Sequence, residues 1–282
     1  MNRPVSSRWP RRRWLVAGVL AVVVLAAGAI SYAATQPAIQ TFTPISANQI
    51  TNLDVLRQQI RNYYGDPLGT GVFAPDSNYA REASFVAKLG SAYLAGRSHF
   101  SDHGKQKAIV LDVDDTSLAT WNYEVFSNWA YNPATNATFV LNQMFPAVPG
   151  MVDMANAAAK EGYAIFFITG RGAAQEAATL GNLTSDGVGV DAGFPSPTTL
   201  NDGEDGLFTK PAVANYPDYL QAACAGDPNG SCTTIHYKSA TRQHIESLGY
   251  NIVANFGDQF SDLEGGFADK TFKMPNPNYF LP

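Results

Sequence analysis

Apolar residues recur at helical spacing between about residues 50 and 94. A first helix is expected where five of them line one face and Gly65 follows: Ile50, Leu53, Leu56, Ile60 and Tyr63. A second helix is expected from about Tyr79 to Leu94, with four larger apolar side chains on its buried face: Phe85, Val86, Leu89 and Tyr93. Neither helix carries residues suited to catalysis, so both are expected to pack on the main domain or over its site.

From Lys107 onward, short apolar runs alternate with helical segments. The run from Ala108 to Val113 is apolar apart from Asp112, as expected of a central parallel strand that is buried on both faces. Further short strands are expected at residues 163–168, 233–237, 251–256 and 270–272. Helices are expected at residues 151–160, 173–180 and 240–248. The alternation predicts an α/β fold with a Rossmann-like, doubly wound and mostly parallel sheet.

Two long segments interrupt this alternation, at residues 117–149 and 182–232. Both are rich in Asn, Pro, Gly and aromatic residues, which suits cap or specificity elements. We therefore expect one domain over residues 49–282, with a helical extension at 49–98 and a small cap insertion at 117–149.

The N-terminal segment has the pattern of an export signal. Five arginines precede an uninterrupted apolar run from Trp14 to Ile30, and small residues follow at 31–33. This order predicts a secretory signal peptide over residues 1–33, followed by a linker at 34–48. The run is also long enough for an uncleaved membrane anchor, and a buried core helix is a third alternative. The arginines before Trp14 resemble a twin-arginine signal. We expect a secreted or cell-surface protein, with a membrane tether as the alternative to cleavage.

Export would change the charge and the chemistry of the cysteines. Those five arginines are the only charges before residue 34, so the remainder has 14 basic and 24 acidic residues, a net charge of −10. No basic stripe remains, so a nucleic acid polymer is not an expected partner. Cys224 and Cys232 are expected to form a disulfide outside the cytosol. A metal site at this pair is disfavoured because His236 is the one further ligand nearby.

Two carboxylates follow the first expected strand of the sheet. Asp112 and Asp114 lie at the carboxyl edge, where such sheets bind ligands, and residues two apart point roughly the same way. Keeping both ionised is costly unless a cation lies between them. In phosphoryl transfer, Asp112 would attack phosphorus, and Asp114 would protonate the leaving oxygen and later deprotonate water. A solvated acidic turn or an Asp helix cap is the alternative.

Thr169, Gly170 and Arg171 follow the strand expected at 163–168. A hydroxyl there can bind a phosphoryl oxygen, the glycine leaves backbone N–H groups accessible, and the arginine adds charge. An ordinary turn has the same composition.

Lys238 follows the strand expected at 233–237 and precedes a helix that Ser239 would cap. An ammonium group at a helix N-terminus would make an anion site, although most lysines are solvated surface residues. Arg242, one turn further, is either a second phosphate contact or a surface charge.

Asp258 and Asp262 follow the strand expected at 251–256, after Gly257. Their oxygens suit a hard divalent cation, and helix capping by Asp258 is the alternative. Because all four polar groups follow separate expected strands, they should meet at one edge of the sheet. Together they supply what phosphoryl transfer requires.

These motifs resemble the four motifs of the haloacid dehalogenase-like superfamily. The sequences at 112–116, 169–171, 237–239 and 257–263 are most similar to its acid phosphatase branch. That branch comprises the class B and class C bacterial enzymes, the plant acid phosphatases and the vegetative storage proteins. The likeness covers roughly residues 50–275. It implies an Mg²⁺-dependent acid phosphatase that hydrolyses small phosphate monoesters through an aspartyl-phosphate intermediate.

The resemblance also implies roles for particular residues. Asp112 would be the nucleophile, and Asp114 the general acid and base. Because an alkoxide leaving group needs a proton and a halide does not, Asp114 argues against a dehalogenase. Thr169 and Lys238 would hold the transferring phosphoryl group, beside the N–H groups at Gly170 and the charge of Arg171 described above. Four aspartates would hold Mg²⁺, with Asp114 using its carbonyl and Asp262 acting directly or through water: Asp112, Asp114, Asp258 and Asp262.

Several alternatives remain at this stage. The same site could serve a selective 5′-nucleotidase or a phosphotransferase, and a non-catalytic storage or binding protein could use the same fold. Three aromatic residues after the first motif could stack on a nucleoside or aryl leaving group, or pack inside the cap: Trp121, Tyr123 and Trp129. The segment at 182–232 has no counterpart that we can assign, so the substrate stays open.

Overall fold

The structure, a computed structural model, describes residues 52–102, 104–201 and 203–281. The expected signal or anchor at 1–33 and the expected linker at 34–48 lie outside these residues. Within the described part of the chain, no helix has both the length and the apolar character needed to cross a membrane. The sheet and the helices that cover it belong to the compact unit that starts at Leu56.

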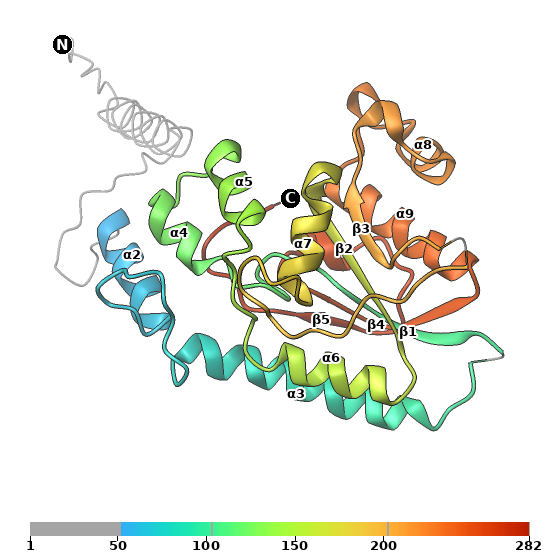
Figure 1. The fold of residues 1–282 in the computed structure, drawn as a ribbon, viewed down its shortest axis with the longest axis horizontal. Helices are drawn as coiled ribbons and strands as arrows, with labels where there is room; N and C mark the ends of the chain where they lie inside the picture. Colours follow the sequence, from blue (N-terminus) through green and yellow to red (C-terminus); the bar gives the residue numbers. More distant parts are fainter. Residues whose placement is uncertain (1–51, 103, 202, 282) are drawn as a thin grey trace, which may run out of the picture. The chain divides into compact units, whose positions relative to one another are not determined.

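Five strands form a single sheet in which every pair of neighbours is parallel. They are β1 (Gln106–Leu111), β2 (Ala164–Gly172), β3 (Leu207–Lys210), β4 (Tyr250–Gly257) and β5 (Thr271–Lys273). The order β3-β2-β1-β4-β5 places β1 at the centre, with strands added first on one side and then on the other (Figure 1). This doubly wound arrangement confirms the predicted α/β class.

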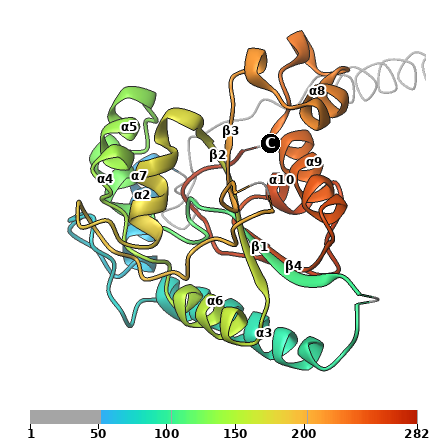
Figure 2. The same ribbon diagram turned by 45° about the vertical axis from the view of Figure 1, so that its right-hand side comes forward.

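Helices cover both faces of the sheet, and alternate residues of β1 point to each. Ile109 and Leu111 join the apolar cluster that includes buried residues of α3 (Asn78–Ser98) and α6 (Met151–Lys160). Ala108 and Val110 join the cluster of α8 (Asp218–Cys224) and α9 (Thr234–Ser247) on the opposite face (Figure 2). A strand buried on both faces must be apolar at every position, which is why this one was evident from the sequence.

The remaining short elements lie in the connections. Segment 117–149 contains α4 (Trp121–Ser127) and α5 (Pro133–Leu141), and α5 packs against α7 (Glu176–Leu183). The helix expected at 173–180 is divided between η2 (Ala173–Gln175) and α7. The others are η3 (Val213–Asn215), η4 (Pro228–Gly230) and α10 (Phe260–Leu263).

The first two expected helices are present, and two of the four side chains predicted on the buried face of α3, Val86 and Tyr93, pack against the core. The helix α2 (Leu53–Tyr63) ends before Gly65, whose φ of 66° only glycine adopts readily. In α3, Phe85 and Leu89 are exposed, and the buried face carries mostly small residues: Tyr79, Ala80, Ala83, Ala87, Gly90 and Leu94. A Cβ at Gly90 would lie 2.6 Å from the ring of Phe256 in β4, so the helix approaches the sheet too closely for large side chains.

The strand predicted at 233–237 is wrong. These residues open α9, and the Thr233 hydroxyl caps the helix by accepting from the backbone N of His236 at 3.2 Å. Ser239 is therefore not the N-cap. The strand at this side of the sheet is β3, within the segment that was expected to be an insertion at 182–232.

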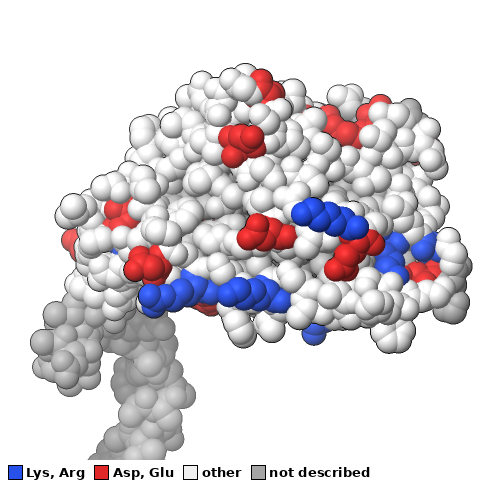
Figure 3. Space-filling view, turned by 60° about the horizontal axis from the view of Figure 1, so that its bottom comes forward, with Lys and Arg blue, Asp and Glu red and all other residues white. Residues whose placement is uncertain are grey.

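The charged side chains on the face that Figure 3 shows are of both signs. Lysine and arginine side chains lie beside aspartates and glutamates and form no continuous basic stripe on this face.

The predicted disulfide between Cys224 and Cys232 is present, with the Cα atoms 4.9 Å apart. Replacing both cysteines by alanine should lower the free energy of unfolding by about 2–3 kcal/mol, because the unfolded chain regains the freedom of the short loop. Denaturant unfolding of the oxidised wild type, the reduced wild type and the double variant measures this effect. An unchanged unfolding midpoint in both altered proteins would mean that other contacts hold this loop.

Candidate active site

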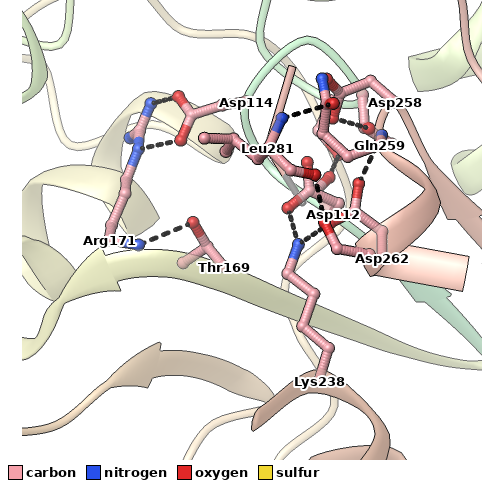
Figure 4. A network of polar contacts seen from close by, with 12 residues as sticks. Asp112, Asp114, Thr169, Arg171, Lys238, Asp258, Gln259, Asp262 and Leu281 are labelled. Carbon is pink, nitrogen blue, oxygen red and sulfur yellow. Dashed lines mark hydrogen bonds and ion pairs between the residues drawn. The ribbon is translucent and has the colours of Figure 1, made fainter. Parts of the chain in front are cut away.

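Three of the four polar motifs lie at the carboxyl ends of neighbouring strands. The motif at 112–116 follows β1, residues 169–171 end β2, and residues 257–262 begin at the end of β4. Because β1 lies between β2 and β4, their side chains meet at one edge of the sheet (Figure 4). Lys238 reaches this edge from the second turn of α9, which packs against β2 and β4.

At the centre of the site, Lys238 lies between two aspartates. Its ammonium group donates to Oδ1 of Asp112 and, at 2.5 Å, to Oδ1 of Asp262 (Figure 4). All three side chains are buried. Burial alone would lower the pKa of Lys238, but Asp112 and Asp262 raise it above its ordinary value, so the ammonium stays charged. Burial raises the pKa of Asp112, which Lys238 opposes and the other carboxylates reinforce.

Asp258 adds a third buried carboxylate to this centre. Asp112, Asp258 and Asp262 each offer an oxygen, and these atoms lie within 4.8 Å of one another. Burial, and then the charges of Asp262 and Asp115, raise the pKa of Asp258 to about 7. Three carboxylates thus share one ammonium group, and a divalent cation would balance the remaining charge. Carboxylate oxygens are the ligands that hard cations such as Mg²⁺ take, so these residues fit such an ion.

Asp114 is held apart from this centre by Arg171. The guanidinium makes two hydrogen bonds to the carboxylate, from Nε to Oδ2 at 3.1 Å and from Nη2 to Oδ1 at 2.6 Å (Figure 4). Nη1 donates to the hydroxyl of Thr179 in α7 at 3.1 Å, and the arginine side chain is buried. The Asp114 side chain keeps 31% exposure. Arg171 therefore fixes the direction of Asp114 in addition to bringing charge to the site.

Thr169 and Gly170 complete the motif at the end of β2. The Thr169 side chain is fully buried, and its hydroxyl oxygen accepts from the backbone N of Arg171 at 3.2 Å. The hydroxyl keeps its own proton to donate. Gly170 is exposed and lines the cavity described below.

Arg242 is neither a phosphate contact nor a surface charge, the two alternatives that its sequence position suggested. Its side chain is buried and donates to backbone carbonyls: Asp262 O at 2.7 Å, Gly266 O at 2.8 Å and Glu264 O. The side-chain amide of Asn255 also donates to Asp262 O, at 2.9 Å. Arg242 therefore holds the end of α10, where Asp262 lies, and the residues that follow it, and it is too deeply buried to act as a surface charge.

A cavity of about 550 Å³ opens over the cluster. Residues of all four motifs line it, and Glu124, Trp129 and Tyr131 line it from the segment that contains α4 and α5. Tyr279 and Leu281 add a further wall from the end of the chain. Sequence analysis missed Glu124, Tyr279 and Leu281, since none of them directly follows an expected strand or belongs to an acidic motif. Burial, reinforced by the charge of Asp114, raises the pKa of Glu124 to about 7.

Two of the three aromatic residues after the first motif pack inside the domain. Trp121 is buried and stacks on Tyr64 with the ring centres 4.1 Å apart, and its indole N–H donates to Asp66 at 3.0 Å. Tyr123 is buried too. Trp129 lies at the cavity, so it is the one of the three whose ring is placed to meet a leaving group.

Comparisons with known proteins agree with this geometry. The chain is 27% identical to acid phosphatase 1 of Solanum lycopersicum over 181 residues, which is 61% of this chain and 58% of that protein. It is 48% identical to vegetative storage protein 1 of Arabidopsis thaliana over 56 residues, 20% of this chain and 21% of that protein. The chain therefore spans less than two thirds of the length of either curated relative.

The fold is similar to that of a class C acid phosphatase from Bacillus anthracis. The TM-score is 0.56 at 19% identity, over 80% of this chain and 86% of that one, and the likeness concerns the fold alone. The sequence model of one family matches residues 24–282, nearly the whole chain. This match confirms the resemblance that the motifs indicated: the protein belongs to the haloacid dehalogenase-like superfamily, subfamily IIIB, the acid phosphatases.

Proposed function

We propose that the protein is an exported, Mg²⁺-dependent acid phosphatase that hydrolyses small phosphate monoesters through a phosphoryl group carried on Asp112. The observation that supports this most strongly is the cluster of three buried carboxylates and one ammonium group beneath an open cavity. Family membership supports the reaction class.

In the first half of the reaction, a carboxylate oxygen of Asp112 attacks phosphorus. The bond between phosphorus and the ester oxygen breaks, and the leaving oxygen takes a proton from the carboxyl group of Asp114. Arg171 aims Asp114 through its two hydrogen bonds, so the acid meets the leaving group in one orientation.

In the second half, a water molecule attacks the phosphorus of the aspartyl phosphate. Asp114, now a carboxylate, takes the proton of that water, and the bond between phosphorus and Asp112 breaks. Phosphate leaves, and both side chains return to their starting states.

Asp112, Asp258 and Asp262, with the backbone carbonyl of Asp114, are the groups that would hold Mg²⁺. When bound, the ion neutralises charge on the phosphoryl oxygens. Lys238 would bind the same oxygens with its ammonium group, and Thr169 with its hydroxyl proton. The backbone of Gly170 and the side chain of Arg171 would form one wall of the phosphoryl site in the cavity.

Export is part of the proposal, on the basis of the N-terminal sequence and the disulfide between Cys224 and Cys232. Cleavage of residues 1–33 would give a secreted protein, and retention would give a tethered one. Mass spectrometry of the protein from the culture medium and from the membrane fraction separates the two.

Turnover of p-nitrophenyl phosphate tests the proposed reaction. The purified protein should hydrolyse this ester with Mg²⁺, and a chelator should lower the rate at least about 100-fold. Added Mg²⁺ should restore the rate. If the protein shows no turnover at every pH tested, a storage or binding protein is favoured instead. The similarity to a vegetative storage protein supports this alternative. Alcohol acceptors and a panel of nucleotides would separate a phosphotransferase or a 5′-nucleotidase from a broad hydrolase.

A further inference from the structure

The segment at residues 276–281, which we call the C-terminal strap, runs beside the carboxylate cluster. It follows β5, and its residues Tyr279 and Leu281 line the cavity (Figure 4 labels Leu281). None of the four motifs lies in the strap, and neither sequence nor family roles assign it a function in the site.

One strap side chain reaches a carboxylate of the proposed metal site. The amide Nδ2 of Asn276 donates to Oδ2 of Asp258 at 2.7 Å. The amide of Gln259 donates to the same oxygen at 2.6 Å. Oδ1 of Asp258 has one weaker contact, from the hydroxyl of Thr116 at 3.4 Å. Two amides thus occupy Oδ2 and leave Oδ1 as the oxygen available to a cation.

A neutral hydrogen-bond donor suits a carboxylate that binds a metal ion better than a positively charged donor would. A carboxamide is neutral, so it fixes the direction of the Asp258 carboxylate without cancelling its charge. A lysine or arginine at position 276 would compete with a bound cation for that charge. Hydrogen bonds of this kind, made to the far side of a ligand, orient the ligand and strengthen metal binding.

The strap is itself held by hydrogen bonds at Asn278 and at Leu281. The amide of Asn278 donates to the hydroxyl of Tyr64 at 2.9 Å, and its oxygen accepts from the indole of Trp129 at 3.3 Å. Leu281 N donates to the side chain of Gln259 at 3.0 Å, and the Ser261 hydroxyl donates to Leu281 O at 3.1 Å. These anchors leave Asn276 little freedom to turn away from Asp258.

We propose that the C-terminal strap belongs to the active site and that Asn276 is a positioning residue, which orients Asp258 for a divalent cation. The proposal rests on the proposed function, because it takes Asp258 to be a metal ligand.

The test is the affinity of the variant Asn276→Ser for Mg²⁺ alone, measured by isothermal titration calorimetry. Oδ1 of Asn276 accepts from the backbone N of Asn278 at 2.8 Å, and a serine hydroxyl can make the same turn but is too short to replace the bond to Asp258. We expect the dissociation constant for Mg²⁺ to rise about 10–100-fold. The unfolding midpoint without metal should stay close to that of the wild type, and high Mg²⁺ should restore most of kcat.

Asn215→Ser is the matched control, since it makes the same substitution at an exposed position of η3 that belongs neither to the strap nor to the cavity wall. Its Mg²⁺ affinity should equal that of the wild type. If Asn276→Ser does not fold, Asn276→Ala is measured in its place. Equal Mg²⁺ affinities in the wild type and in the Asn276 variant would overturn the role of the strap alone. A wild type that binds no divalent cation would overturn the metal of the proposed function as well.

Discussion

Replacing Asp112 by asparagine should abolish turnover of p-nitrophenyl phosphate, with a loss of at least about 10⁴-fold in kcat. An amide oxygen is a poor nucleophile, and the variant cannot form the aspartyl phosphate. The asparagine has the same shape and can still accept from Lys238, so the change tests the chemistry and not the packing. Steady-state kinetics and circular dichroism of the purified variant measure the two effects separately.

Asp76→Asn serves as the control for this variant, because it removes a carboxylate that is exposed on the surface. Its kcat should match that of the wild type. Acid quenching during turnover should trap a phosphorylated protein in the wild type and none in Asp112→Asn. A variant at position 112 that retains activity within tenfold of the wild type would falsify the nucleophile assignment.

The sequence predicted the sheet edge well because buried parallel strands leave a plain signal. The run before Asp112 is apolar on both faces of the sheet, and the run before Asp258 is apolar on both faces apart from Asn251 and the buried Asn255. Acidic residues that directly follow such runs must lie at the carboxyl edge. Three of the four motifs could therefore be placed together before any coordinates were known.

Lys238 shows where the local pattern fails. Thr233, Thr234 and Ile235 are β-branched residues, which favour strands, yet a threonine is also a good helix N-cap. The outcome depends on tertiary packing, because α9 covers one face of the sheet while β3 takes the place beside β2. The lysine reaches the predicted site from a different element.

Long-range contacts explain the other errors. The face of α3 is set by the approach of Gly90 to Phe256, which are far apart in the sequence. Arg242 binds carbonyls of a loop about twenty residues away, and Asn276 binds Asp258 across a strand. Hydrogen bonds between distant segments leave no periodic pattern in a single sequence, so a local pattern cannot reveal them.

Replacing Asp114 by asparagine should have an effect that depends on the leaving group. For an alkyl phosphate such as glycerol phosphate, kcat/KM should fall about 10²–10⁴-fold, because the alkoxide needs a proton to leave. For p-nitrophenyl phosphate the fall should be much smaller, since p-nitrophenolate leaves without one. The value of kcat/KM is the appropriate measure because it covers binding and the first chemical half, before water attacks.

The variant Arg171→Met tests the same step with a milder change. It removes the two hydrogen bonds that aim Asp114 but leaves the carboxyl group in place, where its partial exposure lets water solvate it. We expect the same preference for loss on the alkyl ester, at a smaller magnitude, since a misdirected acid still protonates some leaving groups. Equal losses on both esters in Asp114→Asn would contradict leaving-group protonation by this residue. Asp114 would then contribute to binding or to the attack on phosphorus equally for both esters, and not through the departing oxygen.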